Sequence, residues 1–137
     1  MITALDTNIP SALWSGPPLA AGISASLARA SQEGTLVVCG VVYAELLAYP
    51  GATGGFVERF LEDTRILVEF DFSREVWLSV GERFAAYCHR RRRSGGSESK
   101  RLLADFLVGA HAMLRADRLF TLDPARYRRD FPELRLL

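Results

Sequence analysis

The sequence lacks most of the features that place a chain outside the ordinary globular class. Cys39 and Cys88 are its only cysteines, and their apolar or helical surroundings predict reduced thiols rather than a disulfide framework. No Cys and His spacing indicates a zinc site. No apolar run approaches the roughly 18 residues that a membrane span needs, and the first residues lack the basic stretch and cleavage site of a signal peptide. We therefore expect a cytoplasmic protein that does not bind a membrane.

What is present is the composition of a folded domain. Hydrophobic residues make up 49% and charged residues 24% of the chain, which excludes disordered and collagen-like classes. A length of 137 residues predicts a single domain, residues 1–137, with a sizeable core. The net charge of +1 hides an asymmetry, because arginine supplies nearly all of the positive charge and four arginines form one run at Arg90–Arg93. If several acids converge on one site, the rest of the surface must be basic.

Strand and helix signals alternate along the chain. We expect strands at residues 2–5, 35–40, 66–70, 117–123 and 132–137. We expect helices at residues 8–14, 19–34, 41–49, 53–63, 73–91 and 99–117, with Ser73 as an N-cap. This alternation predicts an α/β fold, a three-layer α/β/α sandwich with a central, mostly parallel sheet.

Two acids follow predicted strands. Asp6 ends the first strand, in LDTN, and Asp123 ends a later one, in LFTLD. Open parallel sheets bind ligands at the carboxyl ends of their strands, so the two carboxylates meet at one edge if these strands are parallel neighbours. The alternative for Asp6 is a helix cap.

Glu45 is the only charge between Leu36 and Tyr49. Apolar residues surround the axis of the predicted helix, so we expect a buried carboxylate, which costs several kcal/mol unless it is paired or protonated. One alternative is a pair with a buried arginine, although none lies nearby in sequence. The other is membership of a cluster of acids that binds a cation.

Asp105 lies on the flank of an apolar stripe in LLADFLVGAHAML. Gly109 and Ala112 share its helical face, and such small neighbours leave room for a cation and its substrate. The alternative is that Asp105 interacts with the dipole of its own helix, because it lies in the first turns.

Four carboxylates at one edge repel one another by roughly 2–4 kcal/mol for each close pair. Such a set needs protons or divalent cations, and ligands that are all oxygen favour Mg²⁺ or Mn²⁺ over zinc. These sites hydrolyse phosphate esters with water that the metal activates. His111 lies about 120° from Asp105 on the helical wheel, and His89 adjoins the arginine run, so we expect neither to act as the base.

The order LDTN, YAEL, ADFLVGAHA and LFTLD, from Leu5 to the closing RYRRDFPELRLL, resembles the PIN-domain ribonucleases, in particular the VapC-type toxins of bacterial toxin–antitoxin pairs. The resemblance implies that Asp6, Glu45, Asp105 and Asp123 are the catalytic acids and the ligands of Mg²⁺ or Mn²⁺. It implies that Thr7, Asn8 and Thr121 do not bind the metal themselves but hold the acids in position. RNA as the substrate comes from the resemblance alone.

The same resemblance implies a toxin that is an endoribonuclease, a small cognate antitoxin with a DNA-binding end, and a homodimer. Trp14 and Leu19 are candidates for the surface that an antitoxin covers. The arginine run has two possible roles. It forms either a rim that guides RNA toward the acids or a solvated helix end whose positive charges interact favourably with the helix dipole. Its members are Arg90, Arg91, Arg92 and Arg93.

Two other functions remain to be separated from this one. The first is a protein of the same fold that binds or processes RNA without a toxin role. The second is an aspartyl phosphatase, whose chemistry needs Asp-x-Asp at the end of the first strand. Asn8 stands where that motif needs its second aspartate, and asparagine cannot donate and take a proton in that role.

Overall fold

A four-stranded parallel sheet lies at the centre of the computed structural model, which describes all 137 residues. Its strands are β1 (Ile2–Leu5), β2 (Thr35–Cys39), β3 (Ile66–Glu69) and β4 (Arg118–Phe120). Their order is β3-β2-β1-β4, and every pair is parallel. Both β2 and β4 are almost completely buried, as is usual for parallel strands that are covered on both faces. The prediction of a mostly parallel sheet is confirmed.

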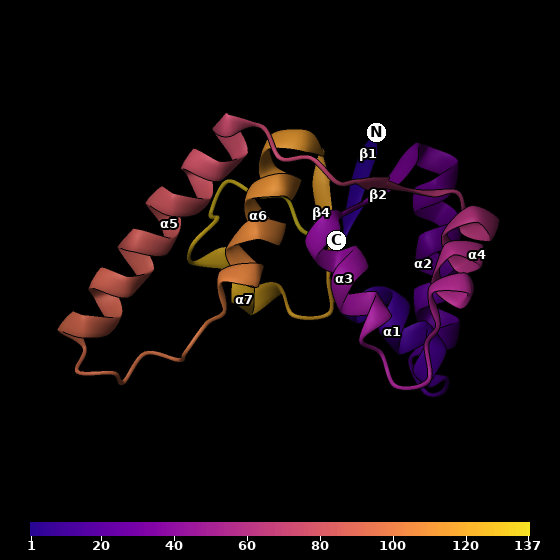
Figure 1. Ribbon diagram of the computed structural model, residues 1–137, viewed down its shortest axis with the longest axis horizontal. Helices are drawn as coiled ribbons and strands as arrows, with labels where there is room; N and C mark the ends of the chain where they lie inside the picture. Colours follow the sequence, from indigo (N-terminus) through magenta and orange to yellow (C-terminus); the bar gives the residue numbers. More distant parts are fainter.

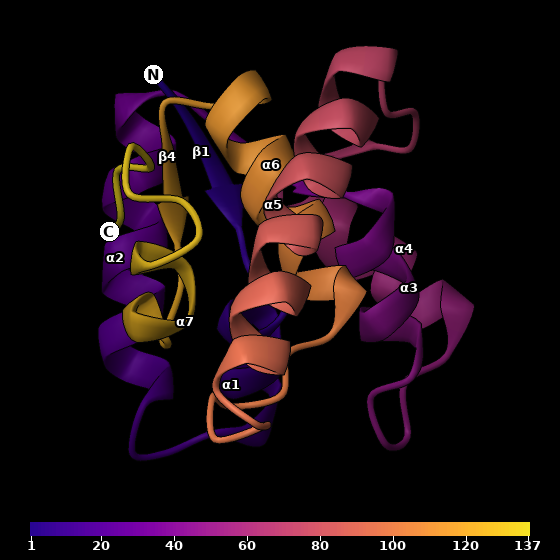
Figure 2. The same cartoon turned by 90° about the vertical axis from the view of Figure 1, so that its left-hand side faces the viewer.

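Seven helices surround this sheet. They are α1 (Asn8–Ser15), α2 (Ala20–Glu33), α3 (Gly40–Leu47), α4 (Gly54–Thr64), α5 (Arg74–Arg93), α6 (Leu103–Arg115) and α7 (Pro124–Arg128). Figure 2 shows α2 on one side of β1 and β4, with α5 and α6 on the other. Helix α5 is outermost and packs on α6 (Figure 1). The predicted three layers are therefore present. No helix combines the length and the apolar character needed to cross a membrane.

Local sequence explains where α5 begins and ends. The Ser73 hydroxyl accepts a hydrogen bond from the Val76 amide at 3.4 Å, which confirms the predicted N-cap. The helix continues through the arginine run to Arg93, two residues beyond its expected end. Gly95 and Gly96 then adopt φ of 66° and 86°, a left-handed conformation that glycine tolerates best. This turn reverses the chain toward α6.

The carboxyl-terminal part of the chain departs from the sequence prediction. Residues 132–137 do not form a full strand, and only one parallel bridge joins Leu136 to Leu119. Helix α7 was not predicted, and Asp123 is its N-cap residue rather than the end of a strand. Strand β4 stops at Phe120, so Asp123 follows the strand after a short link.

Candidate active site

Asp6 and Asp123 lie at the same edge of the sheet. Strands β1 and β4 are parallel neighbours, and Leu5 is in register with Phe120. The residues that follow these two positions therefore leave the sheet side by side, as the sequence predicted. The Asp6 amide continues the pairing by donating to the Phe120 carbonyl at 3.0 Å.

The Asp6 carboxylate is buried, and all the donors that bind it are neutral. Its Oδ2 accepts from the Thr121 hydroxyl at 2.8 Å, the Tyr127 hydroxyl at 2.9 Å and the Asn8 amide at 3.3 Å. Its Oδ1 accepts from the Thr7 backbone amide at 2.8 Å. A buried carboxylate needs such partners to remain charged. These four donors hold it in one orientation.

Thr7 connects Asp6 to Glu45. While its amide donates to Asp6, its hydroxyl donates to Glu45 Oε1 at 2.7 Å. Glu45 itself is exposed, so the prediction that its carboxylate is buried is wrong. Helix α3 buries Val42 and Leu46 and leaves Glu45 on an open face. Its partner is the Thr7 hydroxyl rather than a buried arginine.

Asn8 and Thr121 join the two loops that carry the acids. Asn8 Oδ1 accepts from the Leu122 amide at 3.1 Å, and its Nδ2 reaches the Thr121 hydroxyl at 3.3 Å. The Thr121 oxygen also accepts from the Asp123 amide at 3.1 Å. Thr7, Asn8 and Thr121 therefore all hydrogen-bond to acids or to the segments that carry them, and their role in a catalytic site stays a prediction.

Asp105 and Asp123 share one arginine. Arg126 Nη1 lies 3.3 Å from Asp105 Oδ1, and its Nε lies 3.2 Å from Asp123 Oδ2. Burial lowers the pKa of the Arg126 guanidinium, but the charges of Asp105 and Asp123 outweigh this and raise the pKa above its usual value. The guanidinium places one positive charge between two acids, Asp105 on α6 and Asp123 at the start of α7.

Asp105 has a second partner, because its Oδ2 accepts from the Leu102 amide at 3.3 Å. Its place in the first turn of α6 thus gives it both a helix-end contact and a position in the site. The expectation that Gly109 leaves room for a cation is wrong. A Cβ there would lie 2.4 Å from the Phe131 ring, so the glycine allows that ring to pack against α6. Ala112 is buried as well.

The chemistry of the four acids fits a hard divalent cation. Their donors are all carboxylate oxygens, the type that Mg²⁺ and Mn²⁺ prefer. The side chains of His, Cys, Asp and Glu nowhere form a group of three or more that could hold a metal ion in the present arrangement. The positive charge between Asp105 and Asp123 is the guanidinium of Arg126.

The sequence did not identify Tyr127 or Arg126 as members of the site. Both lie on α7, which had not been predicted, and no spacing linked them to Asp6 or Asp105. The histidines lie elsewhere. His111 is buried and its Nε2 is 2.9 Å from Glu69, with a pKa that burial lowers despite Glu69. His89 is exposed on α5.

The arginine run divides into residues with different partners. Arg90 forms ion pairs with Asp130 and with Glu98. Arg91 and Arg92 line a cavity beside the site, and Arg93 lies on a separate hollow with Arg129. One stretch of sequence thus contains one arginine held by acids and three others that no carboxylate binds.

A family model of the PIN domain matches residues 3–132. A chain in the crystal structure of VapBC2 from Rickettsia felis bound to a DNA fragment from their promoter superposes with a TM-score of 0.73 and 23% identity, covering 100% of this chain and 98% of that chain. A chain of VapBC-1 from nontypeable Haemophilus influenzae gives 0.66 and 24%, covering 100% and 97%. No curated protein matches. The chain belongs to the PIN-domain family of nucleases.

Proposed function

We propose that this protein is an endoribonuclease that depends on Mg²⁺ or Mn²⁺ and acts as the toxin of a type II toxin–antitoxin module. The observation that carries the proposal is the set of acids at the carboxyl edge of the sheet. Asp6 follows β1, Glu45 lies on α3, Asp105 lies on α6, and Asp123 directly precedes α7. Arg126 contributes a cation among them. A protein that only binds RNA gains nothing from several acids at one edge of the sheet, since carboxylates repel phosphate.

These four acids would hold the divalent cation. When bound, it would polarise a phosphate oxygen and promote the ionisation of water. The protein's own contribution is to orient the carboxylates. The Tyr127 hydroxyl stays protonated, because burial raises its pKa and the charge of Asp6 and the bond to it add to the effect. The Tyr127 hydroxyl therefore donates a hydrogen bond to Asp6 at neutral pH.

Arg126 has a second consequence for the cation. A divalent cation held by Asp105 and Asp123 would compete with the guanidinium of Arg126, which now pairs with both carboxylates. Arg126 is more than a third exposed, so its side chain can move without opening the core. Once released, it would be well placed to pair with a phosphate of the RNA, since guanidinium and phosphate match in geometry.

The partner is proposed on the basis of fold similarity and surface. The similar chains come from VapBC complexes, which supports a small antitoxin with a DNA-binding end for this chain. Leu19 is 52% exposed and offers apolar contact area. Trp14 is half-buried and packs against Tyr49, Phe56 and Phe60. An antitoxin would contact only the exposed part of this aromatic cluster. A homodimer would let two antitoxins act together.

A cleavage assay tests the proposal. A labelled single-stranded RNA pool is incubated with the purified protein in Mg²⁺, in Mn²⁺ and in EDTA. We expect cleavage only with the metals and none for Asp105→Asn. The control is Asp63→Asn, which removes an exposed carboxylate on α4 and should cleave like the parent. Cleavage in EDTA, or full activity in Asp105→Asn, would contradict the proposal.

The toxin role needs a separate test. The chain is expressed alone and together with its neighbouring short reading frame, and growth of the host is followed. The toxin role is supported if the chain alone arrests growth of the host and the neighbouring reading frame relieves that arrest. The Asp105→Asn variant should not arrest growth. Cleavage without growth arrest would favour an RNA-processing enzyme of the same fold.

A further inference from the structure

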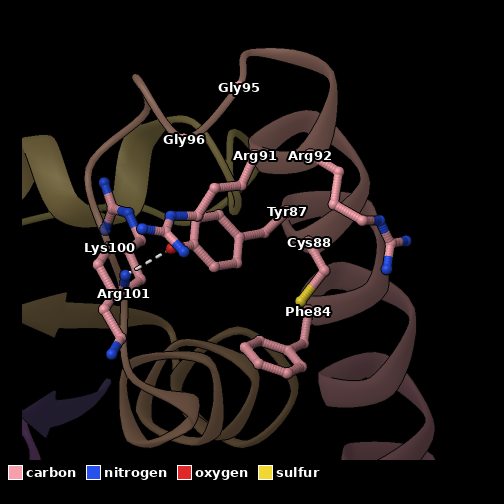
Figure 3. A pocket seen from close by; sticks show the side chains of 9 residues that line it. All are labelled: Phe84, Tyr87, Cys88, Arg91, Arg92, Gly95, Gly96, Lys100 and Arg101. Carbon is pink, nitrogen blue, oxygen red and sulfur yellow. Dashed lines mark hydrogen bonds between the residues drawn. The ribbon is translucent and has the colours of Figure 1, made fainter.

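A cationic cavity lies beside the acid site, between the end of α5 and the segment that leads to α6. It has a volume of about 450 Å³, within the range of sites that bind small organic groups. Four cations line it, and no acid does: Arg91, Arg92, Lys100 and Arg101. Figure 3 shows Arg91 reaching across the cavity toward Arg101, whereas Arg92 points to the other side of α5. The walls favour an anionic ligand.

Arg91 differs from its neighbour in the sequence. Arg90 is held by Asp130 and Glu98. The Nε of Arg91 is buried and has no hydrogen-bond partner in the protein, and no carboxylate pairs with its guanidinium. A buried donor on a charged group is costly to leave unpaired. The guanidinium of Arg91 therefore brings an unpaired positive charge to the wall of the cavity, which an anion bound there would neutralise.

The other walls are rigid and partly apolar. The Tyr87 hydroxyl accepts from the Arg101 amide at 2.6 Å and donates to the Ser99 carbonyl at 3.1 Å, which fixes the chain on either side of Lys100 (Figure 3). Phe84 and Cys88 complete the wall on α5. The Phe84 ring packs edge-on against Phe106, with centroids 5.2 Å apart. A flat group that enters beside the cations would meet an aromatic side chain.

The cavity adjoins the acids. Lys100 and Arg101 also line a second cavity of about 430 Å³, together with Asp105, Asp123 and Arg126. Arg101 further donates to the backbone carbonyl of Arg126. The two cavities therefore share a wall, which Lys100 and Arg101 form.

We propose that this cavity binds one nucleotide of a single-stranded RNA, next to the phosphodiester that is cleaved. Arg91 and Lys100 bind its phosphate, and its base lies against Phe84, because unstacked bases of single strands pack on aromatic side chains. The proposal rests on the proposed function and names the part of the substrate that this cavity reads.

Binding without divalent metal tests the phosphate contacts. The anisotropy of a labelled single-stranded RNA is measured in EDTA, over a range of salt, for the parent, Arg91→Ala and Lys100→Ala. Each variant should bind more weakly, with a salt slope smaller by about 0.7 for each lost phosphate contact. The matched control is Arg74→Ala, an exposed arginine at the other end of α5, which should bind like the parent. Thermal melts check that each variant is folded.

Equal losses in Arg74→Ala would overturn the proposal, because charge alone would then explain binding. Unchanged binding in both Arg91→Ala and Lys100→Ala would overturn it as well. Inorganic phosphate at millimolar concentration is added as a competitor. If it displaces the RNA from the parent and from Lys100→Ala equally, phosphate competes outside this cavity, and the assignment of Lys100 to an RNA phosphate is overturned.

The base contact is tested by the positions of the cuts. A randomised RNA pool is digested with Mg²⁺ by the parent and by Phe84→Leu, and the fragment ends are sequenced. We expect the parent to prefer certain bases at a position next to the cut and Phe84→Leu to relax that preference. The same profile in both proteins would overturn the nucleotide site. An absence of metal-dependent cutting by the parent would instead contradict the proposed function, while the binding measurements would still decide the phosphate contacts.

Discussion

The two halves of the acid site are held in different ways. Asp6 is buried and accepts four hydrogen bonds from neutral donors, and Thr7 connects it to Glu45. Asp105 and Asp123 are instead joined through the charge of Arg126. The side chain of Asp123 is 44% exposed and that of Asp105 17%.

This difference separates orientation from neutralisation. Neutral donors fix a carboxylate and leave its full charge available to a cation. An arginine also fixes a carboxylate but cancels part of the charge that a metal ion would use. Under the proposed function, the half around Asp6 would keep its charge for a cation, whereas the half around Asp105 would have to exchange the guanidinium of Arg126 for the cation.

The largest expected effects come from replacing one acid in each half. Asp6→Asn and Asp105→Asn should both abolish cleavage of RNA that depends on Mg²⁺, because each removes a carboxylate oxygen from the cation. Their stabilities should differ. An amide at Asp6 places N–H groups against buried donors and should cost about 1–3 kcal/mol of unfolding free energy, whereas Asp105→Asn should cost much less. Urea denaturation measures this difference, and equal stabilities would contradict the comparison.

Tyr127→Phe removes one neutral donor from Asp6 and nothing from Asp105. Losing a group that orients a metal ligand typically lowers activity or metal affinity by about 10–100-fold, and we expect that loss here. Tyr43→Phe is the matched control, because the Tyr43 hydroxyl donates to Glu58 between α3 and α4, away from the acids. Calorimetry with Mn²⁺ and the RNA assay would be run on both. Parent-like values for Tyr127→Phe would remove Tyr127 from the site.

Arg126→Ala tests the half of the site that contains Asp105 and Asp123. With the competing guanidinium gone, Asp105 and Asp123 should bind Mn²⁺ several-fold more tightly, since the repulsion between them is no longer relieved by the protein. Calorimetric titration in the absence of RNA gives the affinity directly. Arg128→Ala is the control, because Arg128 is an exposed residue of the same helix. A weaker or unchanged Mn²⁺ affinity in Arg126→Ala would show that the arginine does not compete.

The smallest effect concerns His111, which lies outside both halves. Its pKa is lowered by burial, although Glu69 opposes the shift and Arg115 adds to it. In the unfolded chain this histidine binds a proton near pH 6.5, about the ordinary value for histidine. In the folded protein, burial disfavours protonation of His111. The unfolded state then holds more protons, so the stability contributed here is present above about pH 6.5 and is lost as the pH falls.

His111→Gln should flatten the decline of stability on acidification, measured as urea midpoints between about pH 7.5 and 5. The pH dependence of RNA cleavage should stay the same, because His111 does not contact the acids. A steeper decline in the variant would contradict the sign of the shift. A change in the cleavage profile would show that His111 takes part in the reaction.

Much of the fold could be predicted because local patterns agree with it. The buried strands, the alternation of strand and helix, and the Ser73 cap are properties of short segments. The positions of Asp6 and Asp123 at one edge followed from parallel pairing alone. Helix α7 was missed because its five residues are too short to show a helical period.

Burial was harder to predict than position. Glu45 was expected inside because its neighbours are apolar, yet it is exposed. An apolar helix such as α3 can bury Val42 and Leu46 and still leave one side open at the edge of a sheet. Gly109 was expected to make space for a ligand, but it makes space for Phe131. The identity of a neighbour from a distant segment cannot be read from the helix itself.

The sequence by itself determined the family, the parallel sheet and the acids that follow its strands, because each depends on residue types at fixed spacing. Only the tertiary structure decided how those acids are held. The Tyr127 contact with Asp6 joins residues 121 positions apart, and Arg126 reaches Asp105 from another helix. The structure likewise directs Arg90 to acids and Arg91 to a cavity. Side chains adjacent in sequence on a helix point in directions about 100° apart, so their partners are set by what packs on each side.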